Sequence, residues 1–361
     1  MGFVDYNESR ARCHVKLCVR WMQTAIEHGT MCGEDSNNNK KGDMSNILLT
    51  GATGFVGNRL LSMLKENGHH CRAAVRRPSS SVDVHAESII VGEIDAHTNW
   101  SQAVKGMDVI VHLAARVHVM NDQADNPLVE FRKINLDGTR SLAEAAAKAG
   151  VKRFIYISTI KVNGEATHGK AFTSQDTPSP SDPYAIAKWE AEKALQQISK
   201  DTGLEVVVIR PTLVYGPGVK ANLYNLIKLV RKRIPLPLAG IKNRRSLVAL
   251  DNLTSLIMTC CEHPAAAGHV FLACDDEAVS TAELIGRIAR SFGQYSTLFY
   301  FPPGIMAWVA GLLGKQAVWQ RLAGSLEVDN SEAKKIMGWQ PVTTMDEELK
   351  RIAASMNGKH H

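Results

Sequence analysis

A tyrosine and a lysine four positions apart, Tyr184 and Lys188, have side chains suited to proton transfer. Asp182 is a good helix N-cap and Pro183 suits the first helical position, so the sequence predicts a helix that begins here. Residues four apart share a helix face, and a lysine ammonium beside a phenol lowers the tyrosine pKa from about 10. We therefore expect Tyr184 to exchange a proton with a substrate oxygen near neutral pH. The alternative is a surface pair without function.

Two hydroxyl residues, Ser158 and Thr159, follow the apolar segment Phe154-Ile-Tyr-Ile157. The carboxyl ends of parallel strands face the crevice in which α/β proteins bind ligands. We expect Thr159 to be the catalytic hydroxyl and Ser158 to support it. The alternative is that one of them only caps the strand.

Three glycines, Gly51, Gly54 and Gly57, stand between an apolar strand pattern at 47–49 and a helix pattern at 58–64. The first glycine allows a tight turn, the second lets backbone approach a pyrophosphate, and the third lets the helix pack on the strand. The N–H groups and the dipole of the helix N-terminus then favour phosphate. This context predicts a dinucleotide-binding loop.

Strand and helix patterns alternate from residue 44 onward, which favours a parallel sheet covered on both faces. We therefore expect an α/β fold, with a Rossmann-like doubly wound sheet and a smaller C-terminal substrate-binding lobe. The expected strands are 47–50, 71–75, 88–91, 109–113, 153–158 and 205–210. The expected helices are 58–67, 100–104, 127–149 and 183–202.

The expected domain division follows the loosening of this pattern after about residue 216. Residues 44–215, with 246–262 returning to them, are expected to form the nucleotide-binding domain. Residues 216–245 and 263–361 are expected to form the lobe. Residues 1–43 are polar and lack the apolar segment of a signal peptide, so we expect a disordered extension or an artefact of the assigned start. A regulatory arm is the alternative.

Composition narrows the class of protein. The 361 residues are 45% hydrophobic and 22% charged, which is ordinary for a soluble globular protein, and the net charge of +6 suits anionic substrates. Basic residues form no long block, so nucleic-acid binding is not expected.

The seven cysteines include no C-x-x-C pair, which favours a reduced, cytoplasmic compartment without a metal site. The longest apolar run, Ile305–Gly314, is too short to span a bilayer and predicts a buried helix, with an interfacial helix as the alternative.

Two arginines, Arg76 and Arg77, follow the second expected strand, where NAD-binding folds of this type place an acid for the ribose hydroxyls. Guanidinium groups suit the 2′-phosphate of NADP(H) through bidentate hydrogen bonds. The sequence therefore favours NADP(H), with NAD(H) possible. The alternative is two solvated loop residues.

The motifs together resemble the extended short-chain dehydrogenases/reductases, in the nucleotide-sugar epimerase/dehydratase group. The resemblance covers roughly residues 45–354 and rests on five motifs in order: Thr50–Gly57, His112–Ala115, Ser158–Thr159, Tyr184–Lys188 and Arg210–Pro217. It implies a catalytic triad of Thr159, Tyr184 and Lys188, and a lobe that holds a UDP-sugar.

The resemblance also implies the binding residues. The cofactor set is Gly51, Thr53, Gly54, Phe55, Val56, Gly57, Arg76, Arg77, Glu93, Ile94, Leu113, Ala114, Ala115, Ser158, Tyr184, Lys188 and Pro211. The substrate set is Arg116, His118, Thr159, Asn222, Arg244 and Arg245, with the last three placed at the diphosphate. Alternative roles remain open for four of these residues. Glu93 is then a solvated acid and His118 a structural residue, and either Arg244 or Arg245 only forms surface ion pairs.

Further phrases, including His112–Asn121 and Arg244–Asp251, resemble a bacterial surface-polysaccharide (O-antigen) branch of the family. Its members are UDP-glucose 4-epimerases or reductases of UDP-4-keto-6-deoxy-N-acetylglucosamine in the UDP-N-acetylquinovosamine pathway. The arginines after the second strand favour the reductase. The alternatives are a 4-epimerase with tightly bound NAD and a non-enzymatic NADP(H) sensor. The resemblance also implies a possible homodimer through helices 127–149 and 183–202.

Overall fold

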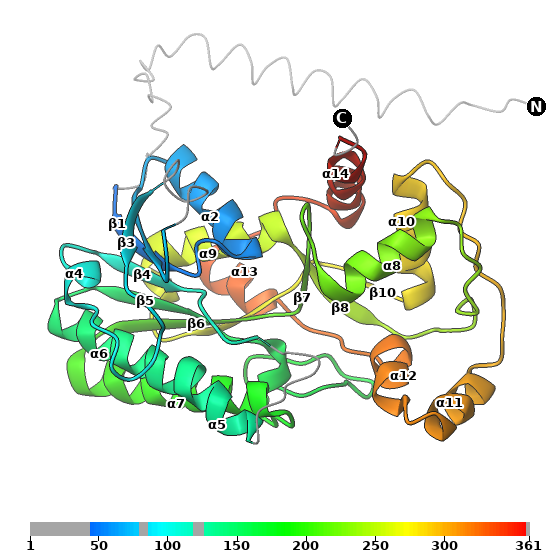
Figure 1. Cartoon of the computed structure of the whole chain (residues 1–361), viewed down its shortest axis with the longest axis horizontal. Coiled ribbons are helices and arrows are strands. Elements are labelled where there is room, and N and C mark those ends of the chain that lie inside the picture. Colours follow the sequence, from blue (N-terminus) through cyan, green and yellow to red (C-terminus); the bar gives the residue numbers. More distant parts are fainter. Residues whose placement is uncertain (1–43, 79–85, 118–125, 359–361) are drawn as a thin grey trace, which may run out of the picture. The chain divides into compact units, whose positions relative to one another are not determined.

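A seven-stranded parallel sheet organises the first part of the chain (Figure 1). The computed structural model describes residues 44–78, 86–117 and 126–358, so His118 and the expectation for residues 1–43 lie outside the described residues. The strand order is β3-β2-β1-β4-β5-β6-β9, with every neighbouring pair parallel. The strands are β1 (Asn46–Thr50), β2 (His70–Val75), β3 (Glu87–Ile90), β4 (Val109–His112), β5 (Arg153–Ile157), β6 (Glu205–Pro211) and β9 (Val270–Ala273). The expected Rossmann-like α/β fold is confirmed.

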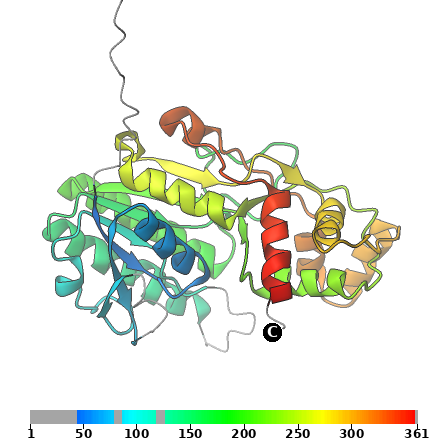
Figure 2. The same cartoon turned by 90° about the horizontal axis from the view of Figure 1, so that it is seen from above.

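Helices cover both faces of this sheet because alternate strand residues point to opposite sides. In β1, Ile47 and Leu49 join the core under one helical layer, whereas Leu48 joins the core under the other. The first layer consists of α2 (Phe55–Glu66), α9 (Leu250–Glu262) and α13 (Ser331–Met337). The second layer consists of α4 (Ser101–Val104), α6 (Thr139–Lys148) and α7 (Pro183–Thr202), and Figure 2 shows the two layers from above.

One expected helix is interrupted. The stretch 127–149 divides into α5 (Pro127–Arg132), a π-helix (Lys133–Gly138) and α6. A Cβ on Gly138 would lie 2.5 Å from Cγ2 of Ile94, so glycine is needed where this helix passes the segment after β3. Turns of π-helix are typical of functional sites.

The structure differs from the expected division at two strands. β9 lies in the range expected to form the lobe, yet it is the seventh strand of the main sheet beside β6. β8 (Arg245–Ala249) was expected to return to the nucleotide-binding domain, but it pairs with β7 (Leu213–Tyr215) and β10 (Ala278–Val279) in a separate sheet. The sheet that a strand joins depends on the strand it pairs with, which is far away in the sequence. An apolar run of four or five residues does not identify that strand.

The second core lies between the three-stranded sheet and three helices, α8 (Ala221–Arg231), α10 (Thr281–Ser291) and α14 (Met345–Asn357). Two further helices follow α10 along the chain, α11 (Pro303–Leu312) and α12 (Gln316–Ala323). No residue of α11 is buried, so the prediction of a buried helix at Ile305–Gly314 is wrong. Within the described ranges, no helix has the length and apolar character needed to cross a membrane.

Candidate active site

The glycine loop lies against the carboxyl end of β4. Gly51 has φ +72°, and a Cβ there would lie 2.8 Å from the backbone nitrogen of Ala114. A Cβ on Gly57 would lie 2.2 Å from the carbonyl oxygen of Gly51. Only glycine therefore fits either position, and the close approach places Leu113, Ala114 and Ala115 beside the loop.

The N-terminus of α2 has the features that a dinucleotide needs. Its N-cap is Gly54, and no side chain caps the helix, so the first N–H groups of the helix have no side-chain acceptor. Thr53 is exposed, and Phe55 and Val56 are half-buried at the same end. A helix N-terminus of this kind attracts phosphate through its N–H groups and its dipole. The residues present therefore fit the phosphates of a dinucleotide.

A buried hydrogen-bond chain joins the glycine loop to the π-helix through His112. The Thr50 hydroxyl accepts from the Ala114 N–H (3.1 Å) and lies 2.7 Å from His112 Nδ1, while His112 Nε2 lies 3.0 Å from Oγ1 of Thr139. Because the Thr139 hydroxyl donates to the Asn135 carbonyl, His112 donates from Nε2 and accepts at Nδ1. Burial lowers the pKa of His112 to about 3, so the ring is neutral and serves to fix the loop.

The loop after β4 is held by the π-helix. The Asn135 side chain accepts from the Arg116 N–H (2.8 Å) and donates to the Arg116 carbonyl (3.0 Å). The Arg116 guanidinium lies 5.6 Å from the ring centre of Phe131, whose ring contacts that of Tyr184 edge-on at 5.9 Å. The structure therefore brings Arg116, expected at the substrate, close to the candidate catalytic tyrosine.

Lys188 is completely buried under the end of β5. Its ammonium donates to the Ile157 carbonyl (2.8 Å) and lies 4.5 Å from the ring centre of Tyr156. Burial lowers the pKa of Lys188 to about 7, and the carboxylate of Glu192 opposes that shift. A lysine that titrates near neutral pH is typical of a functional site.

The pKa of Tyr184 is shifted in the direction opposite to the expected one. Burial, and then the carboxylate of Asp182, raise the pKa of its phenol above the usual value, so the expected lowering by Lys188 is wrong for this structure. The physical reason is that burial penalises the phenolate while the Lys188 ammonium contacts Ile157 and Tyr156. The phenol is therefore protonated, the state of a proton donor.

Thr159 and Ser158 have different environments. Thr159 is half-buried, and its hydroxyl caps the 3₁₀-helix Ile160–Val162 by accepting from the Lys161 N–H at 3.4 Å. Ser158 is buried and donates to the carboxylate of Glu192. The half-buried Thr159 hydroxyl is therefore better placed to meet a ligand than Ser158, which is in a position to support it.

A buried ion pair that the sequence did not indicate lies behind Lys188. Glu192 and Arg210 join at 2.5 Å, with side chains 0% and 3% exposed, and Arg210 also donates to Asn163 at 2.9 Å. The signal that could have found it is the spacing, because Glu192 lies four residues after Lys188 on the same face of α7. The Glu192 carboxylate accepts a hydrogen bond from Ser158 and places a negative charge near Lys188.

An exposed ion pair joins the segment that follows β2 to the segment that follows β3. Arg76 lies 3.5 Å from Glu93, and their side chains are 68% and 65% exposed. Arg77 is also exposed, while Ile94 is buried. An acid therefore does stand near the tip of β2, contributed by the segment after β3, which weakens the argument for a 2′-phosphate.

The expected substrate residues of the lobe are spread along its surface. Asn222 is exposed in the first turn of α8. Arg244 is exposed and pairs with Glu327 at 2.6 Å, while the half-buried Arg245 donates to the Gly324 carbonyl at 3.1 Å. Pro211, expected at the cofactor, is half-buried at the end of β6.

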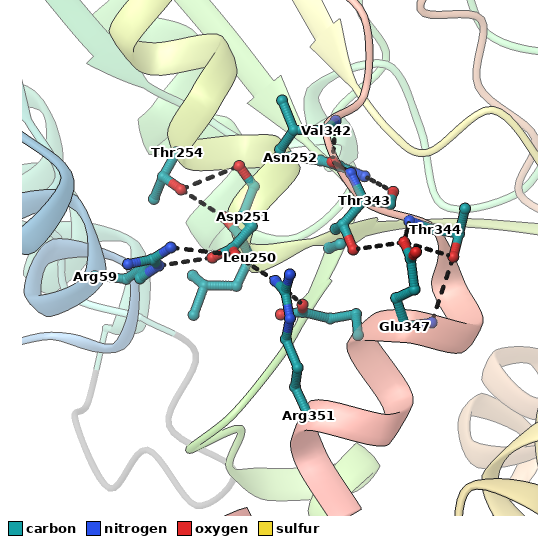
Figure 3. Close-up of polar contacts among 12 residues, drawn as sticks. Arg59, Leu250, Asp251, Asn252, Thr254, Val342, Thr343, Thr344, Glu347 and Arg351 are labelled. Carbon is teal, nitrogen blue, oxygen red and sulfur yellow. Dashed lines mark hydrogen bonds and ion pairs between the residues drawn. The ribbon is translucent and has the colours of Figure 1, made fainter. Parts of the chain in front are cut away.

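Figure 3 shows how the C-terminal helix is joined to Arg59 and Asp251. Arg59 of α2 binds Asp251 of α9 through two hydrogen bonds of 2.7 and 3.2 Å, and Arg351 of α14 binds the same carboxylate at 2.5 Å. A polar cavity of about 380 Å³ lies here, lined also by Phe55 of the loop and by Glu348. The cluster ties α14 to the helix that begins at the glycine loop.

Comparison with known proteins bears on what this arrangement does. Residues 47–274 match the sequence model of the NAD dependent epimerase/dehydratase family. The chain is 45% identical over 310 residues to a UDP-glucose 4-epimerase of Vibrio cholerae, covering 85% of this chain and 94% of that protein. It is 27% identical over 274 residues to the N-acetyl-alpha-D-glucosaminyl-diphospho-ditrans,octacis-undecaprenol 4-epimerase of Escherichia coli O157:H7, covering 74% of this chain and 77% of that protein.

Solved structures confirm the fold. The UDP-glucuronic acid 4-epimerase of Bacillus cereus, solved in complex with NAD, aligns with a TM-score of 0.71 at 21% identity and covers 88% of this chain and all of the other. A second structure, MoeE5 in complex with UDP-glucuronic acid and NAD, aligns with a TM-score of 0.70 at 23% identity and covers 87% of this chain and 99% of the other.

Proposed function

The chain belongs to the NAD dependent epimerase/dehydratase family, and we propose that it interconverts the C4 epimers of a UDP-linked sugar with a bound NAD. The observation that carries the proposal is the 45% identity to the Vibrio cholerae UDP-glucose 4-epimerase over 94% of that protein. The arrangement of Thr159, Tyr184 and Lys188 at the carboxyl end of β5 supports it.

The proposed chemistry divides between the cofactor and the protein. When bound, NAD would supply hydride transfer from C4 and back to the opposite face of the sugar. Tyr184 would take the C4 hydroxyl proton as the phenolate, a form that the positive charge of the bound nicotinamide would favour over the protonated phenol, and would return that proton to the C4 oxygen during reduction. Lys188, held on the Ile157 carbonyl, places a positive charge beside this exchange, and the Thr159 hydroxyl orients the C4 oxygen.

The cofactor is expected to bind across the carboxyl ends of the parallel strands. The α2 N-terminus would hold the pyrophosphate, and Ala114 and Ala115 would leave room beside β4. Because Glu93 lies 3.5 Å from Arg76 near the tip of β2, it would supply an acid for the ribose hydroxyls of NAD.

A reductase of a UDP-4-keto-6-deoxy-N-acetylhexosamine is the second candidate. Two observations favour it: Arg76 and Arg77, which follow β2 and suit NADPH, and the raised pKa of Tyr184, which keeps a proton ready for the C4 oxygen. This reaction needs only the proton-donating half of the cycle, with the reductant supplied from solution.

The two candidates are separated by one set of assays on the purified protein. The nucleotide released on denaturation is identified, UDP-glucose and UDP-N-acetylglucosamine are tested for conversion without added cofactor, and UDP-4-keto-6-deoxy-N-acetylglucosamine is tested for NADPH and NADH oxidation. Conversion without reductant, together with released NAD, supports the epimerase. Rapid NADPH oxidation without epimer conversion replaces it with the reductase.

A further inference from the structure

Helix α11 presents an apolar face to solvent. Its exposed side chains include Ile305, Trp308, Val309, Leu312 and Leu313, which we call the α11 stripe, and the last two are each 67% exposed. Their spacing of three, four, seven and eight residues places them on one side of the helix. A contiguous apolar patch on a folded chain marks a surface that meets a partner.

The stripe continues into a groove between α11 and α12. A cavity of about 520 Å³ opens there, and its lining is apolar apart from one lysine, Lys315. The aromatic rings of Phe299, Phe301 and Trp319 contribute to it. Figure 1 shows both helices on the lobe, with α11 farther than α12 from the main sheet.

The two stretches of sequence that form this part of the lobe contain basic residues and no acidic ones. Residues 284–326 contain no Asp or Glu. Residues 206–250 contain no Asp or Glu either, and they hold nine basic residues: Arg210, Lys220, Lys228, Arg231, Lys232, Arg233, Lys242, Arg244 and Arg245. Arg210 and Arg244 pair with Glu192 and Glu327, so the positive charge beside the α11 stripe comes from the other basic residues, chiefly those of 228–242.

The basic segment after α8 runs beside the apolar one. The Leu236 N–H donates to the Thr297 carbonyl (3.1 Å), and the Ala239 N–H donates to the Phe299 carbonyl (3.2 Å). Lys232, Arg233 and Lys242 are exposed on the same segment. Apolar and cationic side chains thus lie together on one part of the lobe.

We propose that the α11–α12 surface docks on an anionic phospholipid bilayer. The α11 stripe enters the boundary between headgroups and acyl chains, and the basic residues of 228–242 contact the lipid phosphates. A ten-residue helix is about 15 Å long, so it lies in the interface and does not span the bilayer.

The charge pattern argues against a second copy of the chain as the occupant. A two-fold contact through the stripe sets the same surface of each copy against the other. The basic residues of 228–242 would then face the same basic residues of the other copy, and residues 228–242 and 284–326 contain no Asp or Glu to pair with them, which disfavours association. An anionic bilayer supplies the missing charge.

Flotation with lipid vesicles tests the proposal on the full chain. We expect the protein to bind vesicles that contain phosphatidylglycerol more tightly than phosphatidylcholine vesicles. At high salt the two affinities are expected to become similar, because salt screens the charges. The double variant Leu312→Glu and Leu313→Glu is expected to bind vesicles at least tenfold more weakly. Burial of each leucine side chain in the bilayer contributes roughly a factor of ten to the affinity, and that contribution is lost in the variant. Both side chains are exposed, so the fold is retained. The control Val342→Glu introduces one of these two negative charges at a 60% exposed site near α14 and is expected to bind like the wild type.

A second variant tests the charge contribution. Lys232→Glu with Arg233→Glu is expected to abolish the preference for phosphatidylglycerol while leaving the thermal transition unchanged. Absence of wild-type binding to phosphatidylglycerol vesicles overturns the proposal. It is also overturned if sedimentation shows a dimer that the two leucine substitutions convert to monomer, since the stripe is then an interface between copies.

Discussion

Replacement of Glu192 by glutamine tests the buried cluster under the candidate active site. The carboxylate is 0% exposed, pairs with Arg210 at 2.5 Å and accepts a hydrogen bond from Ser158. Glutamine keeps the shape but removes the charge, so the Arg210 guanidinium, 3% exposed, is left buried without a counter-charge. Removing one partner of a buried pair costs about 3–5 kcal/mol, and we expect Glu192→Gln to lose a free energy of unfolding in that range.

The same helix supplies a matched control. Glu190 also pairs with an arginine, Arg132, but these side chains are 22% and 41% exposed. An exposed pair contributes about 0.2–1 kcal/mol, so Glu190→Gln is expected to change stability little. Urea unfolding of both variants measures the difference, and equal losses would refute the assignment of Glu192 and Arg210 as a buried ion pair.

The cluster also predicts a change in pH dependence. The carboxylate of Glu192 raises the pKa of Lys188, which burial has lowered to about 7. Without the carboxylate, Lys188 loses its charge at lower pH, so the alkaline limb of the pH–rate profile moves down in Glu192→Gln. A purely structural role leaves that limb in place, and an unmoved limb would contradict the proposed action through Lys188.

Three further predictions test the loop, the C-terminal helix and the catalytic tyrosine. Gly51→Ala adds a backbone clash at 2.8 Å to a strained φ of +72°, whereas Gly150→Ala has a similar φ of +77° and open space; cofactor binding, measured by titration, is expected to fail only in Gly51→Ala. Burial raises the pKa of Glu348 to about 7 from an ordinary value of 4.5, so its stabilising effect is complete below pH 4.5 and is lost as pH rises through 7. In the wild type this loss lowers the free energy of unfolding by about 3 kcal/mol between pH 4.5 and pH 7. Glu348→Gln has no such titration, so its stability is expected to stay level across that range, and a decline equal to that of the wild type refutes the assignment. Tyr184→Phe is expected to fold and bind cofactor with most of its turnover lost, and full turnover refutes its catalytic role.

The sequence predicted those parts of the fold that depend on local pattern. Expected strands such as 47–50 and 205–210 agree with β1 and β6 to within one residue, because each is an apolar run bounded by turn residues. The helix 183–202 agrees at both ends, since Asp182 caps it and Gly203 ends it with φ +78°.

Features that depend on distant partners were missed. The place of β9 in the main sheet follows from its pairing with β6, and the partnership of Ser158 with Glu192 joins residues 34 positions apart. The Tyr184 pKa was predicted in the wrong direction because its burial is a tertiary property. The exposure of α11 was missed because a run of apolar residues usually indicates burial.

The fate of the hydrogen at C4 tests the proposed function most directly. UDP-glucose carrying deuterium at C4 is incubated with the purified protein without added cofactor, and the product is analysed by mass spectrometry and NMR. We predict UDP-galactose that keeps the deuterium at C4, because the bound cofactor returns the same hydride to the opposite face. Loss of deuterium to solvent, or absence of conversion by protein that contains NAD, would contradict the account.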